Sequence, residues 1–131
     1  MSERISRYED FWPVYVRFHS HPANRALHLL GSSAALAALG AFLRTGRGRY
    51  LLAAPVLGYG PAWIGHFFIE GNRPATFEYP LWSLRADMEM VFRMLTGTMD
   101  AEVERHTAAP EDPAAVDEPA DAPVTTPIDV N

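Results

Sequence analysis

The chain has 131 residues, the size of one ordinary domain, and its lack of cysteine excludes disulfide scaffolds, cysteine-ligated metal sites and thiol nucleophiles. Its net charge of -5 at pH 7 argues against a nucleic-acid partner. The charge is divided unevenly, because all 11 basic residues, which are arginines, precede residue 106, whereas residues 106–131 hold 6 acidic residues and no basic one.

The N-terminal part predicts a short helix that is followed by a proline. Aromatic and aliphatic residues recur between Phe11 and Ser20, and the His21-Pro22 pair then interrupts or starts a helix, because proline lacks an amide hydrogen. The first 25 residues also carry several charged side chains and no apolar segment, so we expect no cleaved signal peptide.

Two long uncharged stretches follow, at residues 26–43 and 50–69. A membrane-spanning helix needs about 20 apolar residues. Because the TGRGR segment between the stretches is short, they predict an antiparallel transmembrane hairpin. The alternative is a soluble bundle with two buried helices, since apolar runs of this length are ambiguous.

Small residues and helix breakers favour the membrane interpretation. The first stretch is rich in Gly, Ala and Ser, which suits close helix contact in lipid. The second contains Pro55, Gly58, Gly60 and Pro61, which membrane helices tolerate when their neighbours satisfy the freed backbone groups. Three arginines lie in the connecting loop and seven flank the hairpin, so the positive-inside rule puts both termini in the cytoplasm.

The C-terminal part predicts one more helix and a tail. After Pro80 the apolar residues fall on one helical stripe, Glu89 and Arg93 are spaced for an ion pair, and Gly97 is expected to end the helix. This helix should lie along the membrane interface or pack on the hairpin. The chain thus divides into a membrane helical domain, 1–105, and an acidic Pro/Ala-rich disordered tail, 106–131.

The predicted fold class is all-α, a small membrane helical bundle built on a transmembrane helical hairpin with flanking amphipathic helices.

Within this fold, three histidines and one glutamate form the candidate site. His28 lies near the start of the first apolar stretch and His66 near the end of the second, so an antiparallel hairpin brings them to the same end. Glu70 follows His66 by one helical turn, and His19 can fold back onto this end. Imidazole and carboxylate groups suit a divalent iron, manganese or zinc ion, and ionisable groups at membrane depth are functional candidates.

Each of these residues also has a simpler interpretation. The two hairpin histidines could each be hydrogen-bonded packing residues. The whole role of Glu70 could be an ion pair with Arg73 at the end of the helix. His21 is most simply a helix-entry residue beside the proline, and His106 a solvated side chain next to the tail.

Two segments of the sequence resemble a known family. The resemblance is carried by YVRFHSHPANRALHLLG (15–31) and GHFFIEGNRPATFEYPLWSLRADMEM (65–90) and extends over about residues 8–97. These segments are similar to the family named for the metabolism of phytosphingosine to odd-numbered fatty acids, formerly a domain of unknown function, which includes iron-dependent 2-hydroxy fatty acid dioxygenases. The resemblance implies a membrane protein that uses Fe(2+) and O2 to shorten a 2-hydroxy fatty acid by one carbon.

By position, the resemblance assigns metal ligation to His19, His28 and His66, and Glu70 matches the acidic position after the Gly-His pair. Arg73 is the candidate catalytic residue, because a guanidinium can bind the substrate carboxylate; its alternative role is to cap helix carbonyls. The expected partners are a fatty-acyl substrate, O2 and membrane lipid, and Zn or Mn could replace iron. The competing hypothesis is a non-enzymatic small membrane protein whose His and Glu residues serve packing or partner recruitment.

Overall fold

The computed structural model describes residues 4–108, and these fold into five α-helices with two short helical turns and no strand. The elements are α1 (Tyr8–Phe18), α2 (Pro22–Thr45), α3 (Gly48–Ile64), the π-helical turn η1 (Gly65–Glu70), the 3-10 turn η2 (Ala75–Phe77), α4 (Pro80–Thr96) and α5 (Met99–Thr107). The prediction of an all-α fold is confirmed. The predicted disorder of the tail concerns residues that lie, from 109 onward, outside the described part of the chain.

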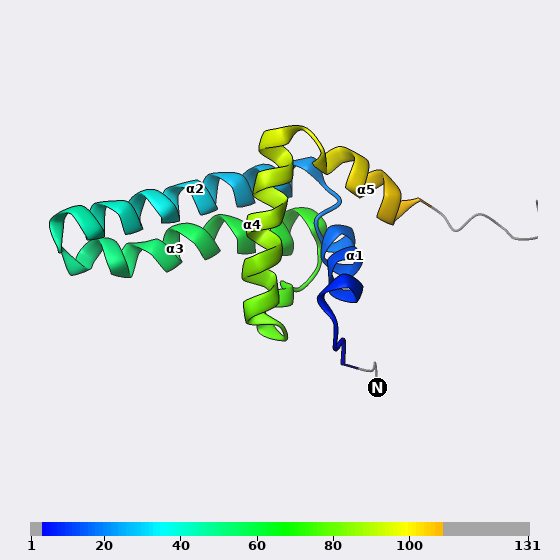
Figure 1. The fold of residues 1–131 in the computed structure, drawn as a ribbon, viewed down its shortest axis with the longest axis horizontal. Coiled ribbons are helices and arrows are strands. Elements are labelled where there is room, and N and C mark those ends of the chain that lie inside the picture. Colours follow the sequence, from blue (N-terminus) through cyan, green and yellow to red (C-terminus); the bar gives the residue numbers. More distant parts are fainter. Residues whose placement is uncertain (1–3, 109–131) are drawn as a thin grey trace, which may run out of the picture.

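The two apolar stretches form a long antiparallel hairpin of α2 and α3 (Figure 1). Their connection is shorter than the sequence indicated, because α2 ends at Thr45 and α3 begins at Gly48. Gly46 makes this turn possible by adopting a left-handed conformation with φ 66°. The helices approach closely at Gly31, where an added Cβ would lie 2.8 Å from the Gly58 carbonyl oxygen. Small residues at this crossing thus bring the two backbones together.

The second apolar stretch is not one uniform α-helix. It continues from α3 into η1, whose wider turn carries His66. This change comes after Pro61, which lies inside α3 and cannot donate a backbone hydrogen bond to the preceding turn. Such π-turns are rare in proteins, and those that do occur are often found at functional sites. Gly71, with φ 68°, then ends the helix in a left-handed conformation.

The principal core lies outside the hairpin, among α1, α4 and α5. Its buried residues come from α1 (Phe11, Trp12, Tyr15 and Val16), α4 (Ala86 and Met90) and the start of α5 (Met99). Figure 1 shows these three helices gathered at the end of the hairpin opposite its loop, with α4 running across α2 and α3. The hairpin therefore projects from a small packed unit that contains the N-terminal and C-terminal helices.

The hairpin and α4 expose large apolar side chains instead of burying them. On the hairpin, Leu43 is 83% exposed and Leu52 is 75% exposed. The apolar stripe of α4 behaves in the same way, because Leu81 is 80% exposed while Ser83 and Ala86 are buried. Helices α2 and α3 with η1 are long and apolar enough to cross a membrane, and α2 rises about 36 Å over its 24 residues. Contact with lipid would account for these surfaces, which would be costly in water.

One helix, α5, was not anticipated from the sequence. Its Glu102 accepts a hydrogen bond from Trp12 Nε1 at 2.9 Å and lies 3.2 Å from His106 Nε2, so α5 is attached to α1. The prediction that His106 is simply solvated is therefore corrected, because its side chain is only 19% exposed and contacts Glu102. The Trp12 hydrogen bond is the main reason why the pKa of Glu102 lies below its usual range.

Candidate metal centre

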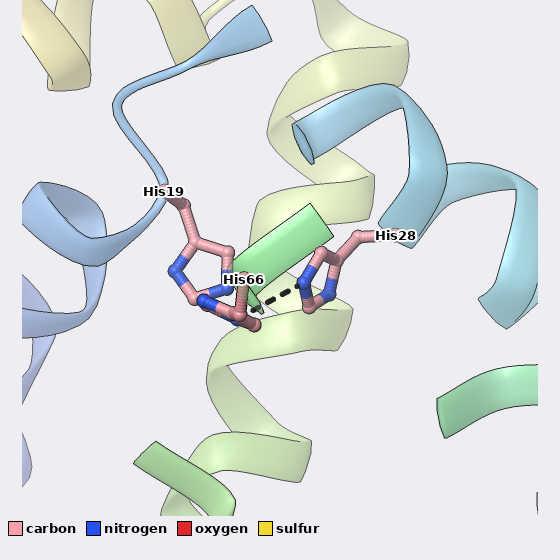
Figure 2. A group of neighbouring side chains, drawn as sticks. All are labelled: His19, His28 and His66. Atoms are coloured by element: carbon pink, nitrogen blue, oxygen red, sulfur yellow. Dashed lines mark hydrogen bonds between the residues drawn. The ribbon is translucent and has the colours of Figure 1, made fainter. Parts of the chain in front are cut away.

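Three histidines from three separate segments converge at the packed end of the hairpin. His19 follows α1, His28 lies in the second turn of α2, and His66 lies in η1 (Figure 2). One nitrogen from each ring lies within 4.8 Å of the other two, and all three residues are buried. The His28 and His66 rings are nearly perpendicular, and their Nε2 atoms are 3.3 Å apart. The predicted meeting of these imidazoles is thus present in the fold.

The other nitrogen of each ring has an acceptor partner. His19 Nδ1 lies 2.6 Å from the Tyr15 carbonyl oxygen, His28 Nδ1 lies 2.8 Å from Asp87 Oδ1, and His66 Nδ1 lies 2.6 Å from Asn72 Oδ1. A carbonyl and a carboxylate can only accept, so Nδ1 must carry the proton in His19 and His28.

The same proton position follows for His66. Asn72 uses its amide nitrogen to donate to the Phe18 carbonyl oxygen at 3.1 Å. This contact fixes which end of the amide faces His66, and that end is the oxygen. In the neutral form, each of the three rings therefore has its unprotonated nitrogen at Nε2. In metal sites of proteins, a hydrogen bond from the ring nitrogen that does not bind the ion commonly orients the ligating histidine; here that nitrogen is Nδ1.

Without a cation, this arrangement has an unfavourable consequence. His19 Nε2 is buried and has no hydrogen-bond partner among the described residues. The facing Nε2 atoms of His28 and His66 bring two lone pairs together unless a proton or a metal ion lies between them. Burial, followed by the neighbouring His28 and His66, lowers the pKa of His19 well below its usual range, which keeps this ring neutral at pH 7.

The geometry fits a divalent ion. Nitrogen ligands about 2.1 Å from a common ion stand about 3.4 Å apart in a tetrahedral arrangement. The 3.3 Å separation of His28 Nε2 and His66 Nε2 matches this value, and the centroid of the His19 ring lies 4.5 Å from the centroids of both other rings. Three protein nitrogens also leave coordination positions open, as in catalytic rather than structural metal sites.

Arg25 holds the segment that carries His19. Its Nη1 donates to the carbonyl oxygens of His19 at 2.9 Å and Ser20 at 2.6 Å, and its Nη2 pairs with Asp100 at 3.1 Å. The Arg25 side chain is only 7% exposed. One buried guanidinium thus fixes the turn between α1 and α2 and links it to α5.

Glu70 lies outside the cluster formed by the three histidines. Its carboxylate accepts hydrogen bonds from the His21 backbone N–H at 2.6 Å, the Ser20 hydroxyl at 3.3 Å and the Asn24 amide at 3.4 Å. These donors surround the beginning of α2, where free N–H groups and the helix dipole favour a negative charge. Glu70 ends the same π-turn that carries His66, but its carboxylate is bound at the N-terminal end of α2 and does not join the three imidazoles.

Arg73 and His21 also lie away from the three rings. The Arg73 guanidinium stands 4.8 Å from the centroid of the Phe77 ring, and its side chain is exposed. His21 caps α2, because its Nδ1 accepts the backbone N–H of Ala23 at 3.1 Å. The interpretation of His21 as a helix-entry residue is therefore confirmed.

Sequence reasoning missed Asp87, Asn72 and Tyr15, which support the rings. Asp87 is the most central of them, because it also accepts the Ser32 hydroxyl at 2.5 Å and the Tyr15 hydroxyl at 3.4 Å. Burial, with Asp87 adding to it, raises the pKa of Tyr15 well above its usual range, so the phenol stays a donor. The available signal was modest: Asp87 is one of two acidic residues in α4 and lies one turn after Ser83.

A cavity of about 460 Å³ adjoins the histidines. Its polar end is lined by all three imidazoles, and its other walls come mainly from apolar residues of α2, α3 and α4. Along α2 it extends from His28 to Leu39, a rise of about 16 Å. Leu51 of α3 and Leu84 of α4 also line it, so the cavity lies where the hairpin meets the crossing helix.

Fold and site together define an all-helical protein with two candidate membrane spans and a buried three-histidine cluster able to hold a metal ion. Residues 5–99 match the family described as 2-hydroxy-palmitic acid dioxygenase Mpo1-like. This match covers well over half of the chain, and the chain belongs to this family. No curated protein and no solved structure gave a significant match.

Proposed function

We propose that this protein is a membrane-bound, iron(II)-dependent dioxygenase that shortens 2-hydroxy fatty acids by one carbon. The observation that carries the proposal is the convergence of three buried imidazoles whose Nδ1 atoms are all engaged, next to an apolar cavity. Membership of a dioxygenase-like family supports the same reaction class.

In this proposal His19, His28 and His66 hold the ion through Nε2. Bound iron(II) would supply electrons to O2 and a Lewis-acidic position for the hydroxyl and carboxylate oxygens of the substrate. Asp87 and Asn72 keep two of the rings in the tautomer that leaves Nε2 free. Glu70 supports the site indirectly, because it secures the start of α2, from which His28 projects one turn later.

The overall reaction balances without an external reductant. One 2-hydroxy acid and one O2 give the acid shortened by one carbon, one CO2 and one water. The C1–C2 bond breaks, C1 leaves as CO2, and C2 is oxidised from an alcohol to a carboxyl group. O2 accepts the four electrons released, so the protein needs no binding site for a reducing cofactor.

The cavity suits a substrate with one polar end and one long apolar chain. The head group would lie at the imidazoles, and the acyl chain would extend along α2 toward Leu39. The cavity's length of about 16 Å is close to half of the 30 Å hydrocarbon core of a bilayer. An acyl chain that occupies one leaflet therefore has a comparable length.

We further propose that the hairpin spans the membrane with both termini in the cytoplasm. Seven flanking arginines against three near the loop support this orientation. The crossing helix α4 would then lie along the interface with its exposed apolar stripe in the lipid, and the core of α1 and α5 would face the cytoplasm. A substrate could reach the cavity from the bilayer without entering water.

The competing hypothesis, a packing role for the histidines, explains the structure less well. A purely structural buried histidine satisfies both ring nitrogens, since an unpaired buried polar atom costs about 1–3 kcal/mol. His19 Nε2 has no such partner, and the His28 and His66 lone pairs face each other. A bound cation removes both penalties.

The test is to purify the full chain in detergent, measure bound metal, and supply 2-hydroxypalmitate with O2. We expect stoichiometric iron and a product one carbon shorter, and His66→Ala should lose both while remaining helical. His106→Ala is the matched control, because its ring contacts Glu102 and lies outside the cluster. Wild-type protein that binds no metal and forms no shortened acid would refute the proposal.

A further inference from the structure

One polar side chain that lines the cavity forms no hydrogen bond with the histidines or with their hydrogen-bond partners. It belongs to Ser83 of α4, which is only 5% exposed. Its hydroxyl is buried and has no hydrogen-bond partner among the described residues. Buried hydroxyls in native proteins nearly always have a partner, so an isolated one beside a cavity indicates a group that a ligand satisfies.

Ser83 lines the cavity from the same helix as Asp87. It precedes Asp87 by four residues on α4, so the two side chains share a face about 6 Å apart along the helix axis. Asp87 in turn contacts His28 Nδ1. Thr76 of η2 also lines the cavity. The free hydroxyl therefore lies one helical turn from the carboxylate that contacts His28.

The position of Arg73 leaves the substrate carboxylate without its expected partner. Arg73 packs over Phe77, is exposed, and is not among the residues that line the cavity. A carboxylate that enters the cavity beside the histidines must therefore find its hydrogen-bond donors among the residues that line the cavity. Ser83 offers such a donor on α4.

We propose that the Ser83 hydroxyl donates a hydrogen bond to the carboxylate of the 2-hydroxy fatty acid and positions C1 and C2 at the histidines. This inference rests on the proposed function, because it identifies how the same cavity recognises the head group. Ser83 thereby favours amphiphiles with a carboxylate over alcohols of equal chain length.

The proposal can be tested by ligand binding without turnover. Purified full-length protein is kept under nitrogen and titrated with 2-hydroxyoctanoate, and binding is followed by the fluorescence of Trp63, which lines the cavity. Trp63→Phe establishes which part of the signal arises there. The same titration with 1,2-octanediol, which lacks the carboxylate, reports the contribution of the chain and the hydroxyl.

We expect Ser83→Ala to weaken 2-hydroxyoctanoate binding about tenfold or more, since hydrogen bonds to charged groups are worth at least that factor. Binding of the diol should change by less than about threefold, and Ser83→Thr should restore most of the affinity for the acid, because it keeps the hydroxyl. Ser33→Ala is the matched control, because Ser33 is exposed on α2 and does not line the cavity. The melting temperature of Ser83→Ala should equal or exceed that of wild type, because an unpaired buried hydroxyl is removed and no internal hydrogen bond is lost, and its metal content should be unchanged.

Equal affinity of Ser83→Ala and wild type for 2-hydroxyoctanoate would overturn the proposal, as would an equal loss of diol binding. A lower melting temperature with unchanged affinity would overturn it too, because it would show a structural role. The Ser83 proposal and the proposed function can fail independently of each other. Oxygenase activity without a Ser83 effect refutes only this inference, whereas Ser83-dependent binding of the acid without metal or product refutes only the reaction.

Discussion

Asp87→Asn tests whether the carboxylate beside His28 tunes the metal site. The change keeps the size of the side chain and removes its charge. Asp87 Oδ1 accepts from His28 Nδ1 at 2.8 Å, and Oδ2 accepts from the Ser32 hydroxyl. Asparagine can retain an oxygen toward His28, and the Ser32 hydroxyl can rotate to accept from the new amide, so the main loss is charge.

The magnitude follows from this exchange of a charged acceptor for a neutral one. A hydrogen bond to a charged group contributes about 1.5–3 kcal/mol and a neutral one about 0.5–1.5 kcal/mol. The midpoints of these ranges differ by about 1.3 kcal/mol, which corresponds to a roughly tenfold lower metal affinity, at the lower end of the usual range for partners of ligating histidines. The charged carboxylate makes the His28 ring a better donor to the ion, and the amide does not.

The assay is competition for iron(II) or cobalt(II) against a chelator of known affinity, with circular dichroism as a check on folding. Glu89→Gln is the matched control, because Glu89 lies on the same helix and pairs with Arg93 at 2.9 Å without contacting a histidine. We expect Asp87→Asn to bind metal about ten times more weakly than either wild type or this control. An affinity within about twofold of wild type, or an equal loss in Glu89→Gln, would refute the reasoning.

Two further predictions concern packing and pH. Gly65→Ala should lower the free energy of unfolding by about 1–3 kcal/mol and weaken metal binding, because the new Cβ would overlap Asn24 Oδ1. Gly60→Ala is the control: a Cβ added there has no atom within 4 Å, so this variant should be neutral or slightly stabilised in the same thermal unfolding assay. The attachment of α5 should be fully present above about pH 4.5 and be lost as the pH falls through the lowered pKa of Glu102, because protonation weakens its hydrogen bond from Trp12. Hydrogen exchange of α5 amides between pH 3 and 6 measures this (the range is roughly that over which carboxylates titrate). A protection factor that does not change with pH, or one that changes with pH equally in Glu102→Gln, would contradict the prediction.

Much of the fold could be read from local signals in the sequence. The apolar stretches predicted both hairpin helices, the position of Pro22 predicted the start of α2, and Gly97 predicted the end of α4. These signals are local because they depend on backbone donors, chain stiffness and periodicity within a few residues. α5 was missed because its stability comes from contacts of Met99 and Glu102 with other helices, which no local pattern expresses.

The sequence also determined which imidazoles could meet. Antiparallel pairing of two helices with a short loop brings His28 and His66 to one end, and the break before Pro22 leaves His19 free to turn toward them. Residue type alone made a divalent ion the natural ligand. These conclusions required only the topology of a hairpin.

Only the tertiary structure decided which nitrogen each ring presents and where the carboxylates go. Asp87 reaches His28 because α4 crosses the hairpin, and Glu70 turns to the start of α2 because a π-turn changes the direction of its side chain. Ring orientation depends on hydrogen-bond partners that are distant in sequence, and a shift of a single residue in helical phase redirects a side chain by about 100°. Periodicity can therefore bring groups to one end of a helix pair, but only packing fixes the atoms that face one another.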